Sequence, residues 1–246
     1  ATPKQPGTNT PTLDSDGKVT VPNNTPAGTY TIVYQICDKL NSGNCATTTA
    51  TVVVGTPTIT ADPDTFTITT GTSTKSVLDN DKIGTATATT NTVSISVVTG
   101  ATPKQPGTNT PTLDSDGKVT VPNNTPAGTY TIVYQICDKL NSGNCATTTA
   151  TVVVGNPTIT ADPDTFTITT GTSTKSVLDN DKIGTATATT NTVSISVVTG
   201  ATPKQPGTNT PTLDSDGKVT VPNNTPAGTY TIVYQICDKL NSGNCA

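Results

Sequence analysis

The stretch TYTIVYQICDKLNSGNC, residues 29–45, decides the fold of this chain, and it recurs unchanged at residues 129–145 and 229–245. Its first part alternates with a period of two, so that one face carries the large apolar side chains Tyr30, Ile32, Tyr34 and Ile36. This alternation predicts a β-strand with one buried face. The Asp, Asn, Ser and Gly residues that follow predict a turn. We expect the rest of each unit to pack around this hairpin.

An internal repeat of 100 residues organises the whole sequence. Residues 1–100 and 101–200 differ at one position only, Thr56 against Asn156, and residues 201–246 begin a third copy. Gly55 and Pro57 flank the first of these positions, as expected for a short joint where one element ends and the next begins. The predicted domains are the C-terminal half of a repeat (1–55), a complete repeat (56–155) and a repeat that lacks its last strand (156–246).

The rest of the complete unit is predicted to form short strands separated by turns. Thr makes up about a quarter of the repeat, Val and Ile add β-branched content, and no segment has helical periodicity. About seven or eight strands are expected, among them a brief strand at 75–78 and a strand at 92–98 with Val93, Ile95 and Val97 inward. This pattern predicts an all-β chain of tandem immunoglobulin-like β-sandwiches that form an elongated rod.

The charged residues exclude several classes of function. The net charge is −4, all basic residues are Lys, all acidic residues are Asp, and His, Glu, Arg, Met and Trp do not occur. We therefore expect no nucleic-acid partner, because the chain has no basic surface for phosphates. No signal peptide or apolar run of 18 residues is present, so we interpret the chain as a mature or excised segment and expect no membrane insertion.

The six cysteines occur as one C-x7-C pair in each copy. Two thiolates without His or further Cys cannot complete a tetrahedral zinc site within a unit. We predict three disulfides, each of which closes a loop of about nine residues and stabilises its unit by about 2.5 kcal/mol. The predicted pairs are Cys37–Cys45, Cys137–Cys145 and Cys237–Cys245. Disulfides imply an oxidising compartment and a secreted protein.

Pairs of Asp residues are the only candidates for acid–base chemistry or metal binding. Each pair adjoins Pro, Asn or Gly, where Asp commonly bonds to backbone N–H groups in turns, so we expect no enzyme activity. Structural calcium is the alternative use of these carboxylates, since calcium accepts several oxygen ligands in irregular geometry. The candidate ligands are Asp62, Asp64, Asp79, Asp81, Asp162, Asp164, Asp179 and Asp181. No other cofactor is expected.

Two further features allow a structural and a functional interpretation. Tyr130 and Tyr134 could stack on sugars, but their place on the apolar face predicts core packing, with Tyr130 as the corner tyrosine of a sandwich. The Thr-rich outward faces are what solvated strands commonly use, and they could also carry glycans.

Several motifs resemble a known family of repeats. PAGTYTIVYQICDKLNSGNC (26–45), ADPDTFTI (61–68) and SVLDND (76–81) resemble the tandem immunoglobulin-like repeats of giant surface adhesins of gliding Bacteroidota, the SprB-type gliding adhesins. ADPDTF and VLDND are also similar to bacterial cadherin-like repeats. The resemblance implies a secreted cell-surface filament that is exported by type IX secretion and moved along the cell to grip a substratum.

The near-identity of the copies indicates that function scales with the number of units. We therefore predict a stalk segment of a cell-surface adhesin, for gliding motility or surface attachment, in which each unit extends the rod by about 35–45 Å. The expected partners are neighbouring repeats and a surface polysaccharide or substratum. Two alternatives remain: a repetitive module in which every unit binds a glycan or polymer, and a filament built by strand exchange.

Overall fold

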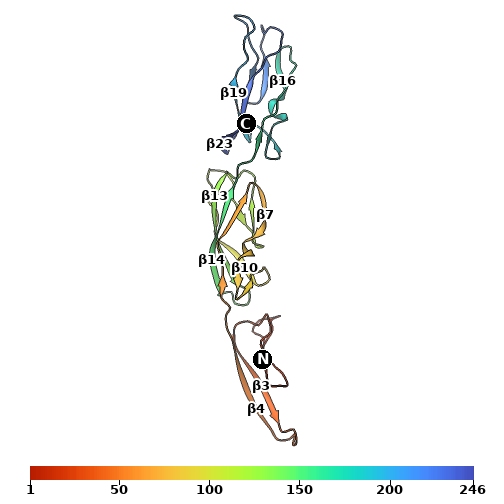
Figure 1. The fold of residues 1–246 in the computed structure, drawn as a ribbon, viewed down its shortest axis with the longest axis vertical. Helices are drawn as coiled ribbons and strands as arrows, with labels where there is room; N and C mark the ends of the chain where they lie inside the picture. Colours follow the sequence, from red (N-terminus) through yellow and green to blue (C-terminus); the bar gives the residue numbers. More distant parts are fainter.

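The computed structural model describes residues 1–246, which form three groups of strands placed end to end along one axis (Figure 1). The first residues lie in one outer group and the last residues in the other. The only helices are two single 3₁₀ turns, η1 (Val77–Asp79) and η2 (Val177–Asp179). The prediction of an all-β chain is thus confirmed. No helix has the length and hydrophobicity that a membrane-spanning helix needs.

The central group is a two-layer sandwich. One layer is a four-stranded sheet in the order β10-β13-β14-β6, and it faces the smaller sheets β11-β12-β7 and β5-β8-β9. The strands are β5 (Ile59–Thr60), β6 (Asp64–Ile68), β7 (Gly71–Ser76), β8 (Lys82–Ile83), β9 (Ala86–Thr87), β10 (Val93–Thr99), β11 (Thr112–Leu113), β12 (Lys118–Val121), β13 (Gly128–Asp138) and β14 (Cys145–Val154).

The hairpin β13–β14 supplies much of the core between these layers. The strands pair without a break from Gly128 opposite Val154 to Cys137 opposite Cys145. Alternate side chains of both strands point inward, where they pack against β12, η1 and β6. The buried apolar residues of the hairpin are Tyr130, Ile132, Tyr134, Ile136, Ala150, Val152 and Val154. The predicted inward position of the tyrosines is therefore confirmed.

A parallel pairing joins the start of the central group to its end. Strand β6 lies beside β14, with Asp64 opposite Ala150 and Ile68 opposite Val154. This pairing buries Phe66. In the third group the counterparts of these residues, 164–168, form no strand, and Phe166 is half-buried. The counterparts of the β14 residues that β6 pairs with would be 250–254, which lie outside the 246 residues of this sequence, so residues 164–168 have no such partner strand in this structure.

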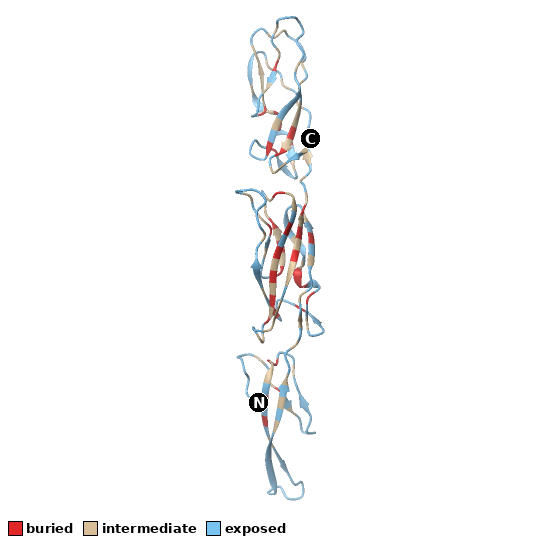
Figure 2. Ribbon diagram, turned by 90° about the vertical axis from the view of Figure 1, so that its left-hand side faces the viewer, coloured by how far each residue is buried: buried red, intermediate tan, exposed pale blue.

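The two outer groups repeat parts of this architecture. The first contains β1 (Thr12–Leu13), β2 (Val19–Thr20), β3 (Gly28–Cys37) and β4 (Cys45–Val54). The third contains β15 (Ile159–Thr160), β16 (Gly171–Ser176), β17 (Lys182–Ile183), β18 (Ala186–Thr187), β19 (Val193–Thr199), β20 (Thr212–Leu213), β21 (Lys218–Val221), β22 (Val233–Asp238) and β23 (Asn241–Cys245). Figure 2 shows that buried residues concentrate in the central group.

Val97 lies opposite the buried Tyr134 and so faces inward as predicted, although it remains 44% exposed. One detail of the predicted strands is wrong. The strand predicted at 75–78 ends at Ser76, and η1 begins at Val77. The Ser76 hydroxyl accepts from the Leu78 N–H and the Asp79 carboxylate accepts from the Ser76 N–H, so a capping box turns the chain there. The unit also has more strands than expected, since several contain two residues only.

Identical residues in different surroundings allow a matched test of the core. Ile136 is fully buried in the central group, whereas Ile36, at the same place in the first group, is 63% exposed. We expect Ile136→Ala to destabilise the central unit by about 2–5 kcal/mol, because it leaves a cavity. Calorimetry of the whole chain should show a lower melting temperature for the transition of that unit. Ile36→Ala should leave this transition unchanged, and equal effects of both variants would contradict the described core.

Candidate functional site

The strongest local feature of each unit is the disulfide at the end of its central hairpin. In the central unit Cys137 and Cys145 are directly opposite each other, with an S–S distance of 2.06 Å and Cα atoms 4.1 Å apart. The same bond joins Cys37 to Cys45 and Cys237 to Cys245, so no free thiol remains. Cys137 and Cys145 are both half-buried residues. The disulfide therefore restrains the end of the hairpin near the surface of the unit.

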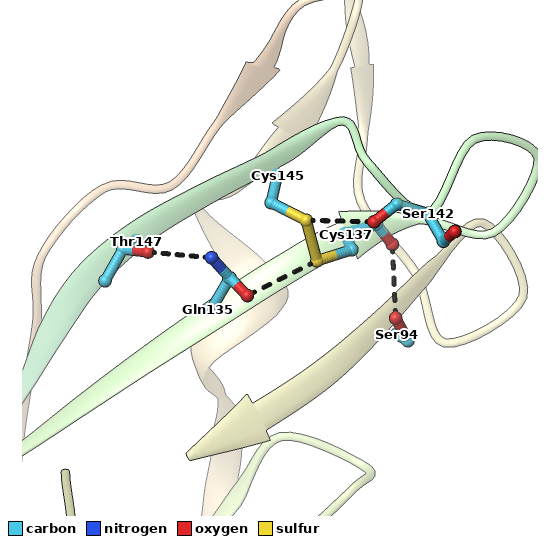
Figure 3. The surroundings of a disulfide bond; sticks show 6 residues. All are labelled: Ser94, Gln135, Cys137, Ser142, Cys145 and Thr147. Carbon is cyan, nitrogen blue, oxygen red and sulfur yellow. Dashed lines mark hydrogen bonds between the residues drawn. A yellow bond between two sulfur atoms is a disulfide. The ribbon is translucent and has the colours of Figure 1, made fainter. Parts of the chain in front are cut away.

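Polar contacts surround the disulfide (Figure 3). The Gln135 amide donates across the hairpin to the Thr147 hydroxyl over 3.2 Å, and its Oε1 lies 3.6 Å from Cys137 Sγ. The Ser94 hydroxyl donates to the Cys137 carbonyl from strand β10 over 3.4 Å. None of these groups is an acid, a base or a free thiol, so the arrangement supports a structural role of the disulfide.

The tip beyond the disulfide is held by bonds of its own. The Asp138 carboxylate accepts from the Leu140 N–H over 2.8 Å, and the Asn144 N–H donates to the Asn141 carbonyl over 2.8 Å. The Asn144 side chain donates to the carbonyl of Pro57 in the linker, also over 2.8 Å. The hairpin tip thus has a defined shape and is fixed to the linker that enters its own unit.

The structure brings two of the predicted calcium ligands together around a tyrosine. The Tyr134 hydroxyl lies 2.8 Å from Asp64 Oδ2 and 3.2 Å from Asp81 Oδ2. Asp81 is fully buried, and its Oδ1 accepts from the Asp62 N–H over 2.8 Å. This cluster connects β6, the segment after η1 and β13, which lie far apart in the sequence. We refer to Tyr134, Asp64 and Asp81 as the tyrosine–carboxyl cluster.

Burial raises the pKa values of this cluster. It raises the pKa of Asp64 to about 6, with repulsion from Asp81, Asp79 and Asp62 acting in the same direction. Burial also raises the pKa of Asp81 and that of the Tyr134 hydroxyl. A phenol has one proton to donate, so it can serve only one of two ionised carboxylates. A second hydrogen bond requires that one carboxyl group keeps its proton.

The third group contains the same cluster. The Tyr234 hydroxyl lies 3.0 Å from Asp164 Oδ2 and 3.2 Å from Asp181 Oδ2. Burial raises the pKa of both carboxyl groups. The sequence patterns alone identified the acidic residues but not the tyrosine that joins them. The available signal was its position on the buried face, because a buried Tyr hydroxyl needs a hydrogen-bond partner.

The other candidate aspartates lie apart from one another. The carboxylates of Asp79 and Asp179 cap the two 3₁₀ turns, and Asp62 and Asp162 contribute backbone N–H groups to the clusters. No group of three or more His, Cys, Asp or Glu side chains is arranged to hold a metal ion. Structural calcium at these residues stays a prediction.

A hollow of about 210 Å³ adjoins the exposed side of Val97. Val97, Ala101, Leu113 and Ile132 supply its apolar lining. Pockets that enclose small molecules commonly measure about 300–1,000 Å³. The hollow is therefore too small to enclose a ligand of that kind.

Comparisons with known proteins give structural neighbours only. No protein-family model and no curated protein sequence matches the chain. Protocadherin gamma B7 EC3–6, in a cis-dimer structure, aligns with 87% of this chain and 55% of its own length, at 16% identity and a TM-score of 0.30. Protocadherin gamma B2 extracellular cadherin domains 1–5 align with 94% and 47%, at 15% identity and a TM-score of 0.29. The chain spans about half the length of these structures, and at such TM-scores the likeness carries no functional argument.

The tyrosine–carboxyl cluster predicts an unusual dependence of stability on pH. Because the pKa of Asp64 rises from 3.8 to about 6 on folding, the folded state binds more protons between these values. The resulting stabilisation is full below about pH 4 and is lost as the pH rises through 6. We expect Asp64→Asn to remove this part of the pH dependence, measured as the melting temperature of the central unit from pH 4 to 8.

Asp116→Asn is the matched control, because Asp116 is exposed and its carboxylate makes no hydrogen bond within the protein. This variant should keep the pH dependence of the unaltered chain. If Asp64→Asn and Asp116→Asn gave the same pH profile, the cluster would not hold the proton inferred for it.

Proposed function

We propose that the chain is a stalk segment of an extracellular adhesin, in which repeats of the frame 56–155 act as rigid spacers. The observation that carries the proposal is the end-to-end placement, along one axis, of three strand groups built from near-identical repeat sequences. A chain whose function depends on its length needs units that fold independently and are joined end to end. One disulfide in each unit supports local folding, and disulfides also favour a site outside the cell.

The finer assignment rests on the resemblance of the sequence motifs. PAGTYTIVYQICDKLNSGNC and ADPDTFTI resemble repeats of SprB-type adhesins, which supports a role in gliding motility or surface attachment after type IX secretion. The proposed partners of each unit are the neighbouring repeats and a polysaccharide or other substratum. The proposal includes no catalytic step.

Small-angle X-ray scattering of the whole chain tests the spacer geometry. A compact globule of this length would have a radius of gyration of about 18 Å. For two and a half units of about 40 Å each we expect about 30 Å, with the mass of one chain. A radius near the globular value would contradict the spacer. A mass of several chains would instead favour a filament built by strand exchange.

A specific surface favours a second candidate, a module that binds a neutral polymer in every unit. Thr131, Thr151 and Thr65 lie side by side on adjacent strands of the four-stranded sheet, on its outer face. Neighbouring strands are about 4.8 Å apart, so the row presents regularly spaced hydroxyl and methyl groups without charge. Such weak contacts would add along many units.

Retention on immobilised neutral polysaccharides separates the two candidates. A pure spacer should pass unretained, whereas a binding module should be retained, and Thr131→Lys should then reduce retention by placing a charge in the row. Thr112→Lys is the control, since Thr112 is exposed on the opposite sheet. Retention that both variants reduce equally would exclude the threonine row as the binding surface.

A further inference from the structure

The contacts between consecutive units follow one pattern at both joints. The Gln5 side chain of the first group donates to the Leu140 carbonyl, at the hairpin tip of the central unit, over 3.0 Å. One repeat later, Gln105 donates to the Leu240 carbonyl over 3.1 Å. The two residues of each pair are separated by 135 positions. A loop of one unit thus reaches the disulfide-bounded tip of the next unit.

The loop that carries the glutamine is fixed to its own unit. The Lys104 ammonium lies 5.2 Å from the centre of the Tyr130 ring, within the range of a cation–π contact. Gly128 leaves room for the Lys104 stem, because a Cβ atom there would lie 2.8 Å from Lys104 Cε. The Thr108 hydroxyl donates to the Gln105 carbonyl over 2.7 Å and closes the loop. Gln105 therefore projects toward the next unit from an anchored base.

The accepting surface is fixed as well. The disulfide and the Asp138 carboxylate hold the turn that presents the Leu140 carbonyl. Leu140 and Leu240, whose carbonyls accept from the preceding unit, are half-buried. The tip is thus the part of each unit that the preceding copy contacts.

The single difference between the copies falls at this joint. Asn156, the counterpart of Thr56, accepts at Oδ1 from the Asn241 side chain at the third hairpin tip over 2.9 Å. Thr56 and Asn141 make no such bond. At both joints the last Asn of the tip also holds a linker carbonyl, through Asn144 to Pro57 and Asn244 to Pro157. The second joint therefore has one more bond between linker and tip than the first.

We infer that the hairpin tip bounded by the disulfide is the docking surface for a preceding copy of the repeat. The preceding copy contacts this tip through the Gln side chain of its Lys–Gln–Pro loop. The residue at position 56 or 156 determines how firmly the joint is held. The inference rests on the proposed spacer function for its biological role. It assigns the disulfide a second task, which is to keep the tip in a shape that the preceding unit can bind.

Distances between spin labels on the whole chain test this inference. Ser15, Ser115 and Ser215 are exposed and occupy equivalent turns, so labels on Ser15→Cys with Ser115→Cys report the first joint. Labels on Ser115→Cys with Ser215→Cys report the second joint. We expect Gln105→Ala to broaden the distance distribution of the second joint only, and Gln5→Ala that of the first only. Loss of one hydrogen bond should raise the undocked fraction roughly two- to tenfold.

Gln205→Ala is the matched control, because Gln205 has the same loop but no following unit in this structure. It should change neither distribution. Unchanged distributions in both Gln5→Ala and Gln105→Ala, or equal broadening by Gln205→Ala, would overturn the docking contact. Either result would leave the scattering test of the spacer unaffected, so the two proposals can fail separately.

Two further pairs of variants test the linker and the disulfide. Thr56→Asn should narrow the distribution of the first joint and Asn156→Thr should widen that of the second; no change in either would overturn the role of this position. Replacing Cys137 and Cys145 by Ser should broaden the first joint, whereas the same change at Cys37 and Cys45 should not. Equal effects of the two cysteine pairs would overturn the second task of the disulfide.

Discussion

The fold of each unit depends on covering the apolar face of its central hairpin. In the central unit Tyr130, Ile132, Tyr134 and Ile136 face a second layer of strands and are buried. In the first group the same sequence lacks the residues that precede it in a complete repeat, and Ile36 stays largely exposed. Strand β3 pairs with β4 along its whole length, whereas in the third group residues 229–232 lack such a partner and strand β22 begins only at Val233. The strand therefore depends on its hairpin partner as well as on local preference. Burial of the apolar face is the main favourable term in folding. This burial requires the second layer of strands, which the complete unit supplies.

The core of the unit contains the tyrosine–carboxyl cluster as well as apolar contacts. Burying a phenol hydroxyl without a partner is costly, and the unit satisfies it with carboxyl groups from two distant segments. Tyr134 thereby links the β5–β6 turn and the segment after η1 to the central strand. The counterparts of these three residues, Tyr234, Asp164 and Asp181, meet in the third group. The cluster therefore belongs to the architecture of the repeat, and its raised carboxyl pKa values follow from that position.

The features at the ends of each unit agree with the proposed role as a spacer. The disulfide lies on the surface at the hairpin end, and the Gln contacts and linker bonds gather at the same tip. These contacts are few, and single hydrogen bonds contribute only about 0.5–1.5 kcal/mol each. Joints of this kind restrict the relative orientation of neighbouring units, while each unit remains a separate folding domain. Near-identical copies can then be added without redesign of the interface.

The sequence by itself determined the fold class, the repeat and most strand positions, because period-two alternation and turn residues are local signals. It also identified Asp64 and Asp81 as notable, and the hairpin cysteines as partners. Only the tertiary structure decided that Tyr134 joins the two aspartates, that β6 runs parallel to β14, and that Gln105 reaches Leu240. These contacts join residues 53 or more positions apart, and no local pattern encodes which distant segments meet. The register shift between Val97 and Thr99 likewise arises from the pairing of separate strands, whereas the capping box that ends β7 is a local contact between Ser76 and Asp79.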